Sequence, residues 1–246
     1  MRRRRAGAAT RPRWDLAGAA AVAGAGWALP AAAPVVPAVA RALRIPTRTA
    51  APGTVALTFD DGPHPEGTPA VLEALAAAGA TATFFLVGEQ VARHGALAGE
   101  IAAGGHAVAV HGYRHHVLLR RRPAAVADDL DRAAETIAAA TGVTPALHRA
   151  PLGIYSWPAL RAVRARGWTP LLWSRWGHDW RARATAASIA EEVAGELRSG
   201  DVLLLHDADH YSAAGCWRAT AAALPRVLDA IAAHGLRPAT AQPDGR

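Results

Sequence analysis

The sequence predicts an α/β fold in which parallel strands alternate with helices and curl into a barrel. Three observations support this prediction. Short apolar runs alternate with helical patterns from residue 54 to residue 240, the runs are apolar throughout rather than at every second position, and most helical patterns end at a glycine. Continuously apolar strands are typical of parallel sheets that helices cover on both faces. Glycine just after a helical pattern indicates where the helix stops.

In chain order, apolar runs rich in Val, Leu, Phe and Trp predict seven strands, at residues 55–59, 83–87, 106–110, 146–149, 168–173, 202–205 and 236–240. Six helical patterns connect them, at residues 69–78, 91–103, 123–141, 157–166, 188–198 and 216–234. A glycine follows each of the six patterns directly or within two residues. This number of units fits a closed or nearly closed barrel better than an open doubly wound sheet, and no glycine-rich dinucleotide loop follows the first strand.

The positive charge of the chain lies at its beginning. The formal net charge is +7, but residues 1–50 hold nine arginines and one acidic residue, whereas the remainder is nearly neutral. The predicted domain therefore has no basic surface for a phosphate backbone, and we expect no nucleic-acid partner. Cys216 is the only cysteine, which excludes an internal disulfide and a cysteine-based zinc site.

The first 50 residues are typical of a targeting segment followed by a linker. Arginines at positions 2–5, 11 and 13 precede a run without charge from residue 16 to residue 40. Basic residues before an uncharged run predict export with the N-terminus inside. The run is long enough to span a bilayer, although three prolines crowd its second half, and Ala38-Val39-Ala40 offers a cleavage site instead. We expect either an outward-facing membrane anchor or a secreted protein, with a domain at 51–246 and residues 1–40 dispensable for its folding.

Residues able to carry chemistry follow the predicted strands. Asp60 and Asp61 follow the first strand, His111 follows the third, and Arg149 ends the fourth. His206 directly follows the apolar run 202–205. In barrels of parallel strands the active site lies at the carboxyl ends of the strands. We therefore expect these side chains to meet in one site.

The histidines predict a metal site. His111 and His115 are four residues apart, so both imidazoles face the same way if this stretch is helical. Two imidazoles and a carboxylate are a common catalytic zinc set that leaves a position for water. His116 is the rival ligand, although its spacing of five from His111 points it elsewhere.

The neighbouring carboxylates Asp60 and Asp61 project in different directions at a strand end. One of them can bind a metal while the other handles a proton. Taken alone, the pair could equally form a turn or a helix cap before Gly62 and Pro63.

Five short segments stand in order along residues 54–240: TFDDGP at 58–63, HGYRH at 111–115, RAPLG at 149–153, DW at 179–180 and LLHD at 204–207. The set resembles the five motifs of the polysaccharide deacetylases with a NodB homology domain, carbohydrate esterase family 4. The resemblance implies a distorted (β/α) barrel of seven or eight parallel strands. It also implies a hydrolase that removes N-acetyl groups from amino sugars of a polysaccharide, with peptidoglycan or another envelope glycan expected because of the export signal.

The resemblance further implies one divalent metal, zinc or alternatively cobalt, bound by Asp61, His111 and His115. Asp60 would be the general base, held by Arg149, and His206 the general acid. The remaining implied residues contact the substrate, through the backbone N–H of Leu152 and the acetyl pocket formed by Trp180 and Leu204.

Two positions depart from the family pattern. Gly112 replaces the usual Ser or Thr and removes a hydroxyl that could steady the metal-binding loop. Trp176 occupies the position of an Asp thought to tune the catalytic histidine, and Asp179, Asp207 or Asp209 could substitute for it. The alternative functions are a deacylase of an O-acetyl or formamido sugar and, because of Trp176, a carbohydrate-binding relative that has lost catalysis.

Overall fold

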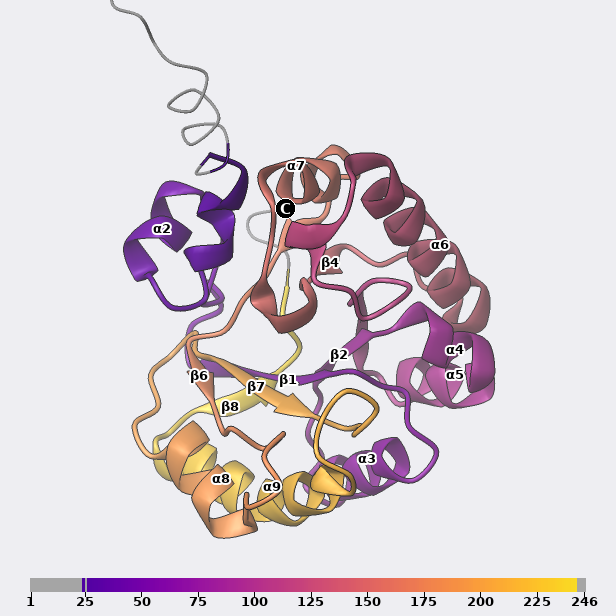
Figure 1. Cartoon of the computed structure of the whole chain (residues 1–246). Helices are drawn as coiled ribbons and strands as arrows, with labels where there is room; N and C mark the ends of the chain where they lie inside the picture. The colour runs from indigo at the N-terminus through magenta and orange to yellow at the C-terminus, as the bar shows by residue number, and fades with distance from the viewer. Residues whose placement is uncertain (1–23, 25, 243–246) are drawn as a thin grey trace, which may run out of the picture.

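The computed structural model describes residues 24 and 26–242, and these form an α/β half-barrel (Figure 1). Seven strands make a parallel sheet in the order β5-β4-β3-β2-β1-β7-β6, and β8 pairs with the first residues of β1. The strands are β1 (Thr54–Asp60), β2 (Thr83–Leu86), β3 (Ala107–Val110), β4 (Leu147–His148), β5 (Thr169–Pro170), β6 (Arg175–Trp176), β7 (Val202–His206) and β8 (Arg237–Ala239).

Helices surround the sheet as an outer ring (Figure 1). They are α3 (Gly67–Ala77), α4 (Gly88–Arg93), α5 (Gly95–Ala103), α6 (Pro123–Thr141), α7 (Trp157–Ala165), α8 (Ala186–Ala194) and α9 (Cys216–Ala233). Local signals set their ends: Pro123 begins α6 without losing a helical hydrogen bond, and Gly142 ends it in the left-handed conformation. The Thr185 side chain caps α8 through the Ser188 N–H.

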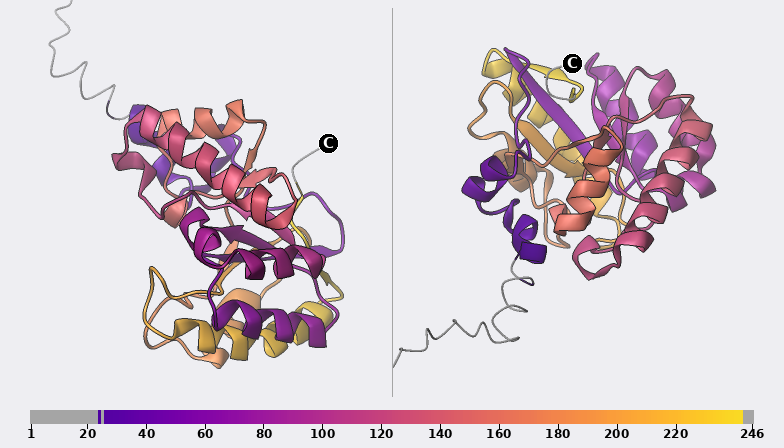
Figure 2. Two further views of the ribbon diagram at one scale, coloured as in Figure 1. Left: turned by 90° about the vertical axis from the view of Figure 1, so that its right-hand side faces the viewer. Right: turned by 90° about the horizontal axis from the view of Figure 1, so that it is seen from above.

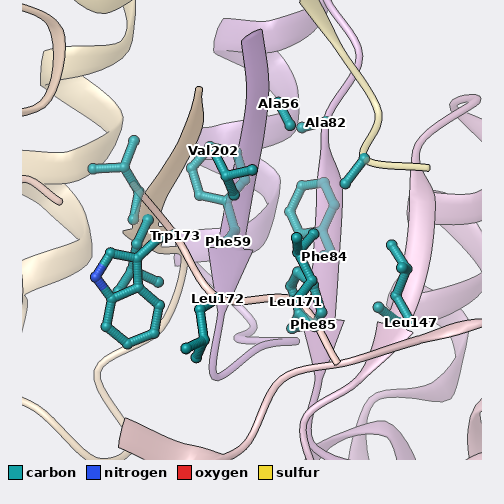
Figure 3. Close-up of a cluster of buried hydrophobic side chains, with 14 of the residues drawn as sticks. Ala56, Phe59, Ala82, Phe84, Phe85, Leu147, Leu171, Leu172, Trp173 and Val202 are labelled. Atoms are coloured by element: carbon teal, nitrogen blue, oxygen red, sulfur yellow. The ribbon is translucent and has the colours of Figure 1, made fainter. Parts of the chain in front are cut away.

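The core lies between the sheet and this ring, and its centre is aromatic (Figure 3). The rings of Phe59 in β1 and Phe84 in β2 stack with centroids 5.1 Å apart. Every residue of β2 is buried, as expected for a strand covered on both faces. The core thus holds β1 rigidly, and β1 carries the first two site residues.

Two predicted elements differ from the structure. The predicted strand 168–173 is only β5: the Leu171 N–H still bonds to the His148 carbonyl at 2.9 Å, but the next N–H, that of Leu172, bonds to the Pro46 carbonyl instead. The chain then crosses to the opposite edge and forms β6, so the sheet stays open between β5 and β6. The predicted helix 91–103 is two helices that meet at His94 and Gly95.

The N-terminal segment, residues 26–49, covers the opening of the half-barrel. It contains the 3₁₀ turn η1 (Leu29–Ala32) and the helix α2 (Pro37–Ala42), which lies between α7 and α8 in Figure 1. Beyond α2 the Pro46 carbonyl accepts a hydrogen bond from the Leu172 N–H at 2.9 Å. Arg48 pairs with the buried Asp201 at 2.7 Å. The segment therefore supplies partners that an adjacent strand would supply in a closed barrel.

This packing differs from the boundary expected at residue 50. Pro30 is buried, and Ala33, Ala40 and Ile45 are each 2% exposed, because they pack against the open edge of the sheet. Part of residues 29–40 therefore packs on the domain, and the dispensability of residues 1–40 for folding stays a prediction. Cleavage after Ala40 would remove this packed part. The beginning of the expected targeting segment, residues 1–23 and 25, lies outside the described residues.

Among residues 24 and 26–242, no helix combines the length and the apolar character that a membrane crossing requires.

Candidate active site

The end of β1 gives its two carboxylates different surroundings. Asp60 is the last residue of the strand, and its Oδ1 accepts a hydrogen bond from Arg149 Nη1 at 2.7 Å. Asp61 follows with φ of +80°, a conformation that Asp tolerates better than most side chains. This turn points Asp61 toward the histidines, with its Oδ1 3.4 Å from the Nε2 atoms of both His111 and His115. Both carboxylates are almost fully buried.

Arg149 holds Asp60 in place from inside the core. The arginine is fully buried, and its guanidinium lies over the Phe85 ring, 4.0 Å from the centroid. Its remaining hydrogen bonds go to the Thr58 hydroxyl and to the carbonyls of Leu171 and Leu172. A buried guanidinium with all these partners is a rigid support for the Asp60 carboxylate.

A loop, not a helix, brings the two histidines together. The condition under which their spacing of four residues predicted a common direction, a helical segment, is therefore not met. His111 follows β3, Gly112 has φ of +100°, and the chain turns to bring His115 back, with ring centroids 5.3 Å apart. A Cβ at Gly112 would lie 3.1 Å from the Arg114 carbonyl, so glycine suits this turn. His116 lies outside the group that Asp61, His111 and His115 form.

The loop has a support that the sequence did not reveal. Asp129 of α6 accepts hydrogen bonds from the N–H groups of Tyr113 at 2.7 Å and Arg114 at 3.2 Å. These bonds steady the loop despite the missing hydroxyl at Gly112. The pairing joins residues 16 positions apart, and no local pattern indicates it.

Asp61, His111 and His115 fit a divalent cation. The Asp61 Oδ1 atom is buried and has no hydrogen-bond partner among the described residues. His111 uses Nδ1 for the Arg149 carbonyl at 2.9 Å, which leaves its Nε2 lone pair toward Asp61. Candidate ligand atoms of the three residues lie within 4.8 Å of one another. An oxygen and two imidazole nitrogens at this spacing are a common donor set for zinc.

The protonation states agree with this interpretation. Burial raises the pKa of Asp61, but the adjacent His111 side chain and the nearby His206 outweigh this effect and lower the pKa to about 2. Burial lowers the pKa of His115 to about 4. The carboxylate is therefore ionised and this imidazole neutral at pH 7, the states in which they bind metals.

A second group, His64, Asp209 and His210, is a hydrogen-bonded cluster instead. The Nδ1 atom of His64 accepts bonds from the N–H groups of Glu66 and Gly67, at 3.2 and 2.9 Å. Its proton is therefore on Nε2, which faces Asp209 at 3.1 Å and offers no lone pair.

His206, on the opposite side of the pocket, is held by Asp179. Its Nδ1 lies 2.9 Å from Asp179 Oδ1, and its backbone N–H donates to Asp179 Oδ2 at 2.7 Å. Thr220 of α9 also donates to Asp179. Of the three acids that could stand in for the residue replaced by Trp176, the structure thus selects Asp179. Burial lowers the pKa of His206, but the Asp179 charge and hydrogen bond dominate and raise it to about 10.

These side chains line one cavity of about 230 Å³. The structure places all three predicted substrate contacts on it, Leu152, Trp180 and Leu204, together with Asp60, Asp61, His111, His115 and His206. Arg149 does not line the cavity itself; it contacts the site through its hydrogen bond to Asp60. Trp176, the departure from the family pattern, also lines the cavity and packs edge-on against Trp180.

Tyr211 is a cavity residue that the sequence did not single out. Its ring stacks on His115 with centroids 4.2 Å apart and planes 9° apart. Its hydroxyl donates to Glu89 at 2.8 Å and accepts from Gln90 at 3.1 Å. The loop after β7 therefore fixes a histidine that follows β3, a contact that sequence spacing cannot indicate.

Residues 47–171 match the polysaccharide deacetylase family. The chain is 39% identical over 155 residues to a chitooligosaccharide deacetylase of Bradyrhizobium sp. (strain ANU 289), an alignment that covers 63% of this chain and 70% of the relative. It is 31% identical over 185 residues to a peptidoglycan-N-acetylglucosamine deacetylase of Bacillus cereus, covering 74% of this chain and 84% of the relative.

Solved structures share the fold. A family 4 carbohydrate esterase from Streptomyces lividans in complex with acetate superimposes with a TM-score of 0.69 at 32% identity, covering 76% of this chain and 91% of that one. A family 4 pseudoenzyme from Bacillus anthracis has the same TM-score at 22% identity and shows the fold alone. The matched family, the curated relatives and the shared half-barrel agree: the chain belongs to the polysaccharide deacetylase family.

Proposed function

We propose that this deacetylase hydrolyses the acetamide of N-acetylglucosamine units in a glycan, with a divalent metal bound by Asp61, His111 and His115. One observation carries the proposal. The unpartnered Asp61 Oδ1 and two imidazole nitrogens converge on the cavity that Asp60 and His206 also line. A base, an acid and a cation site in one small cavity are what amide hydrolysis requires.

The residues divide the work of proton transfer. Asp60 keeps Oδ1 on Arg149 and offers Oδ2 to accept a proton from the attacking water. His206 has Nδ1 on Asp179, so its Nε2 is left for the leaving amine. Because the pKa of His206 is raised to about 10, the ring is protonated at neutral pH and can act as the acid. Each such transfer is typically worth about 10²–10⁴-fold in rate.

The developing oxyanion and the methyl group have separate places. Leu152 has φ of +57°, which turns its peptide at the cavity wall, and we assign its N–H as the oxyanion donor. One such donor contributes about 3–4 kcal/mol. Trp180 and Leu204 form an apolar wall for the acetyl methyl. A bound divalent ion would polarise the carbonyl and ease ionisation of water, and the donor set favours zinc, with cobalt as the alternative.

Two alternative functions fit the site less well. A formamido group has no methyl to occupy the wall formed by Trp180 and Leu204. A carbohydrate-binding protein without catalysis has no need of a buried arginine that supports Asp60, nor of the Asp179–His206 pair. The pseudoenzyme with this fold shows that fold alone cannot decide activity, so the proposal rests on these residues.

The relatives indicate the glycan. One acts, by its name, on chitooligosaccharide and another on peptidoglycan N-acetylglucosamine. The basic residues before the uncharged run support a location outside the cytoplasmic membrane, with the protein anchored or released there. Peptidoglycan or another envelope glycan is therefore the substrate we propose.

Acetate release tests the proposal. The purified full-length chain should release acetate from N-acetylglucosamine oligomers and from peptidoglycan. Removal of metal with a chelator should abolish release, and added Zn²⁺ or Co²⁺ should restore it, because the cation polarises the carbonyl. Full activity of chelated protein with no metal detected would contradict the metal assignment. Release from O-acetylated sugars alone would favour the ester alternative.

A further inference from the structure

Most of the large apolar side chains that are exposed among the described residues come from two segments. Seven large apolar residues are exposed among those described, and five of them belong to the N-terminal segment or to residues 152–157. Val35 is 68% exposed, Leu152 60% and Leu29 49%, and the other two are Val36 and Trp157. Single exposed apolar residues are ordinary, but a concentration of this kind marks an interaction site.

The two segments lie against each other and form one surface. A Cβ on Gly153 would lie 2.8 Å from Pro34 Cγ, so the peptide after Leu152 touches the residue before Val35. The turn η1, which begins at Leu29, packs against α7, which begins at Trp157. Figures 1 and 2 both show the indigo N-terminal segment beside α7. We call Leu29, Val35, Val36, Leu152 and Trp157 the apolar patch.

The apolar patch borders the active-site mouth. Leu152 belongs both to the patch and to the cavity lining. Trp157 begins a helix that follows a strand of the parallel sheet, so it lies at the end of the barrel where the strands finish. Whatever covers the patch therefore also faces the entrance of the cavity.

The surroundings of the patch are basic. Residues 16–59 and residues 136–178, which contain both segments, include no aspartate or glutamate. Arg120, Arg121 and Arg122 are exposed, and the Trp27 indole donates to the neighbouring Leu119 carbonyl at 3.2 Å. Arg41 and Arg44 are exposed in the N-terminal segment. Apolar and tryptophan side chains bordered by arginines are the composition of elements that lie in an anionic membrane interface.

The residues that precede the apolar patch in the sequence indicate what covers it. Residues 1–23 hold six arginines followed by the start of the uncharged run, and the chain passes from them directly into the patch at Leu29. We propose that the apolar patch rests on the surface of an anionic lipid bilayer and turns the active-site mouth toward it. This proposal requires the membrane location suggested above, but it does not depend on the deacetylase reaction.

Depth-dependent quenching in vesicles tests the proposal. Full-length protein with Cys216→Ser is reconstituted in vesicles of phosphatidylethanolamine and phosphatidylglycerol, with a polarity-sensitive fluorophore on Val35→Cys. Val143→Cys is the matched control, because Val143 is also an exposed valine but precedes β4, at the opposite end of the sheet. The label at position 35 should shift to shorter wavelength and be quenched by a lipid-phase nitroxide, and the label at 143 should show neither effect. Circular dichroism of both variants in detergent, compared with the parent chain, checks that they are folded.

Other results would overturn the proposal in distinguishable ways. If the protein floats with the vesicles but position 35 stays unquenched, the upstream segment binds the membrane and the patch does not. If the protein does not float, the membrane location itself fails. If the label at 35 shifts with protein concentration in the absence of lipid, the patch is an interface between copies of the chain.

Discussion

Asp60 and Asp61 show how backbone geometry separates two identical side chains. Asp60 still belongs to β1, so its carboxylate lies beside the core arginine Arg149 at 2.7 Å. Asp61 leaves the strand with φ of +80° and therefore faces His111 and His115. One carboxylate is held by the core, as the proposed proton transfer requires, and the other is left for the proposed cation.

Asp179 should set the alkaline limit of catalysis through the pKa of His206. Its charge and hydrogen bond raise the pKa of His206 to about 10, so Asp179→Asn should lower that pKa. Since the acid must be protonated, the alkaline limb of the kcat profile should move to lower pH by at least about 1 unit. Rate profiles of both proteins, with an NMR titration of His206, measure the shift. An unchanged limb would mean that another group sets it.

Tyr211 should contribute to metal affinity rather than to proton transfer. His115 has no hydrogen bond from Nδ1 to any described residue, so the stacked Tyr211 ring takes the orienting role that Arg149's carbonyl plays for His111. Tyr211→Ala should weaken metal binding about tenfold, as loss of an orienting partner typically does. Tyr211→Phe keeps the stacked ring and should stay close to the parent. Chelator competition measures both, and equal affinity in all three proteins would contradict this role.

Residues at strand ends could be predicted from the sequence because the fold itself places them there. Asp60, His111, Arg149 and His206 each follow an apolar run, and the carboxyl ends of parallel strands meet at one edge. Asp129 and Tyr211 could not be predicted, because each acts across a distance in sequence that leaves no periodic trace.

The apolar strands could be predicted from composition, but the packing of the N-terminal segment on the domain could not. Its alanines and prolines are typical of a targeting segment and linker, whereas the segment packs into the opening between β5 and β6. That opening exists because the chain crosses from β5 to the opposite edge of the sheet to form β6, an order that the sequence does not indicate.

Removing this segment should destabilise the domain. A chain that begins at Ala50 loses the buried Ile45, the Pro46–Leu172 hydrogen bond and the pair between Arg48 and Asp201. The free energy of unfolding should fall by at least about 2–4 kcal/mol, since loss of one buried Ile side chain alone costs this much. Urea unfolding measures it, with a chain that begins at Gly24 as the control. Equal stability of the two chains would show that the packing contributes nothing.

At the scale of the whole molecule, the half-barrel brings five distant segments to one cavity. The N-terminal segment closes its open side and reaches the active site indirectly. The Pro46 carbonyl holds the Leu172 peptide, whose own carbonyl accepts from Arg149, which in turn holds Asp60. Core, opening and active site are therefore linked through one buried arginine.

The most direct test of the proposed chemistry compares Asp60→Asn with Asp61→Asn, measuring metal content and acetate release on the same samples. Asp60→Asn should keep its metal yet lose at least about 10²-fold in kcat with little change in KM, because an amide cannot take the proton from water. Asp61→Asn should bind metal more weakly, because a charged ligand becomes neutral. Near-normal turnover by Asp60→Asn would contradict the mechanism, and metal loss from Asp60→Asn alone would mean that the two carboxylates have exchanged roles.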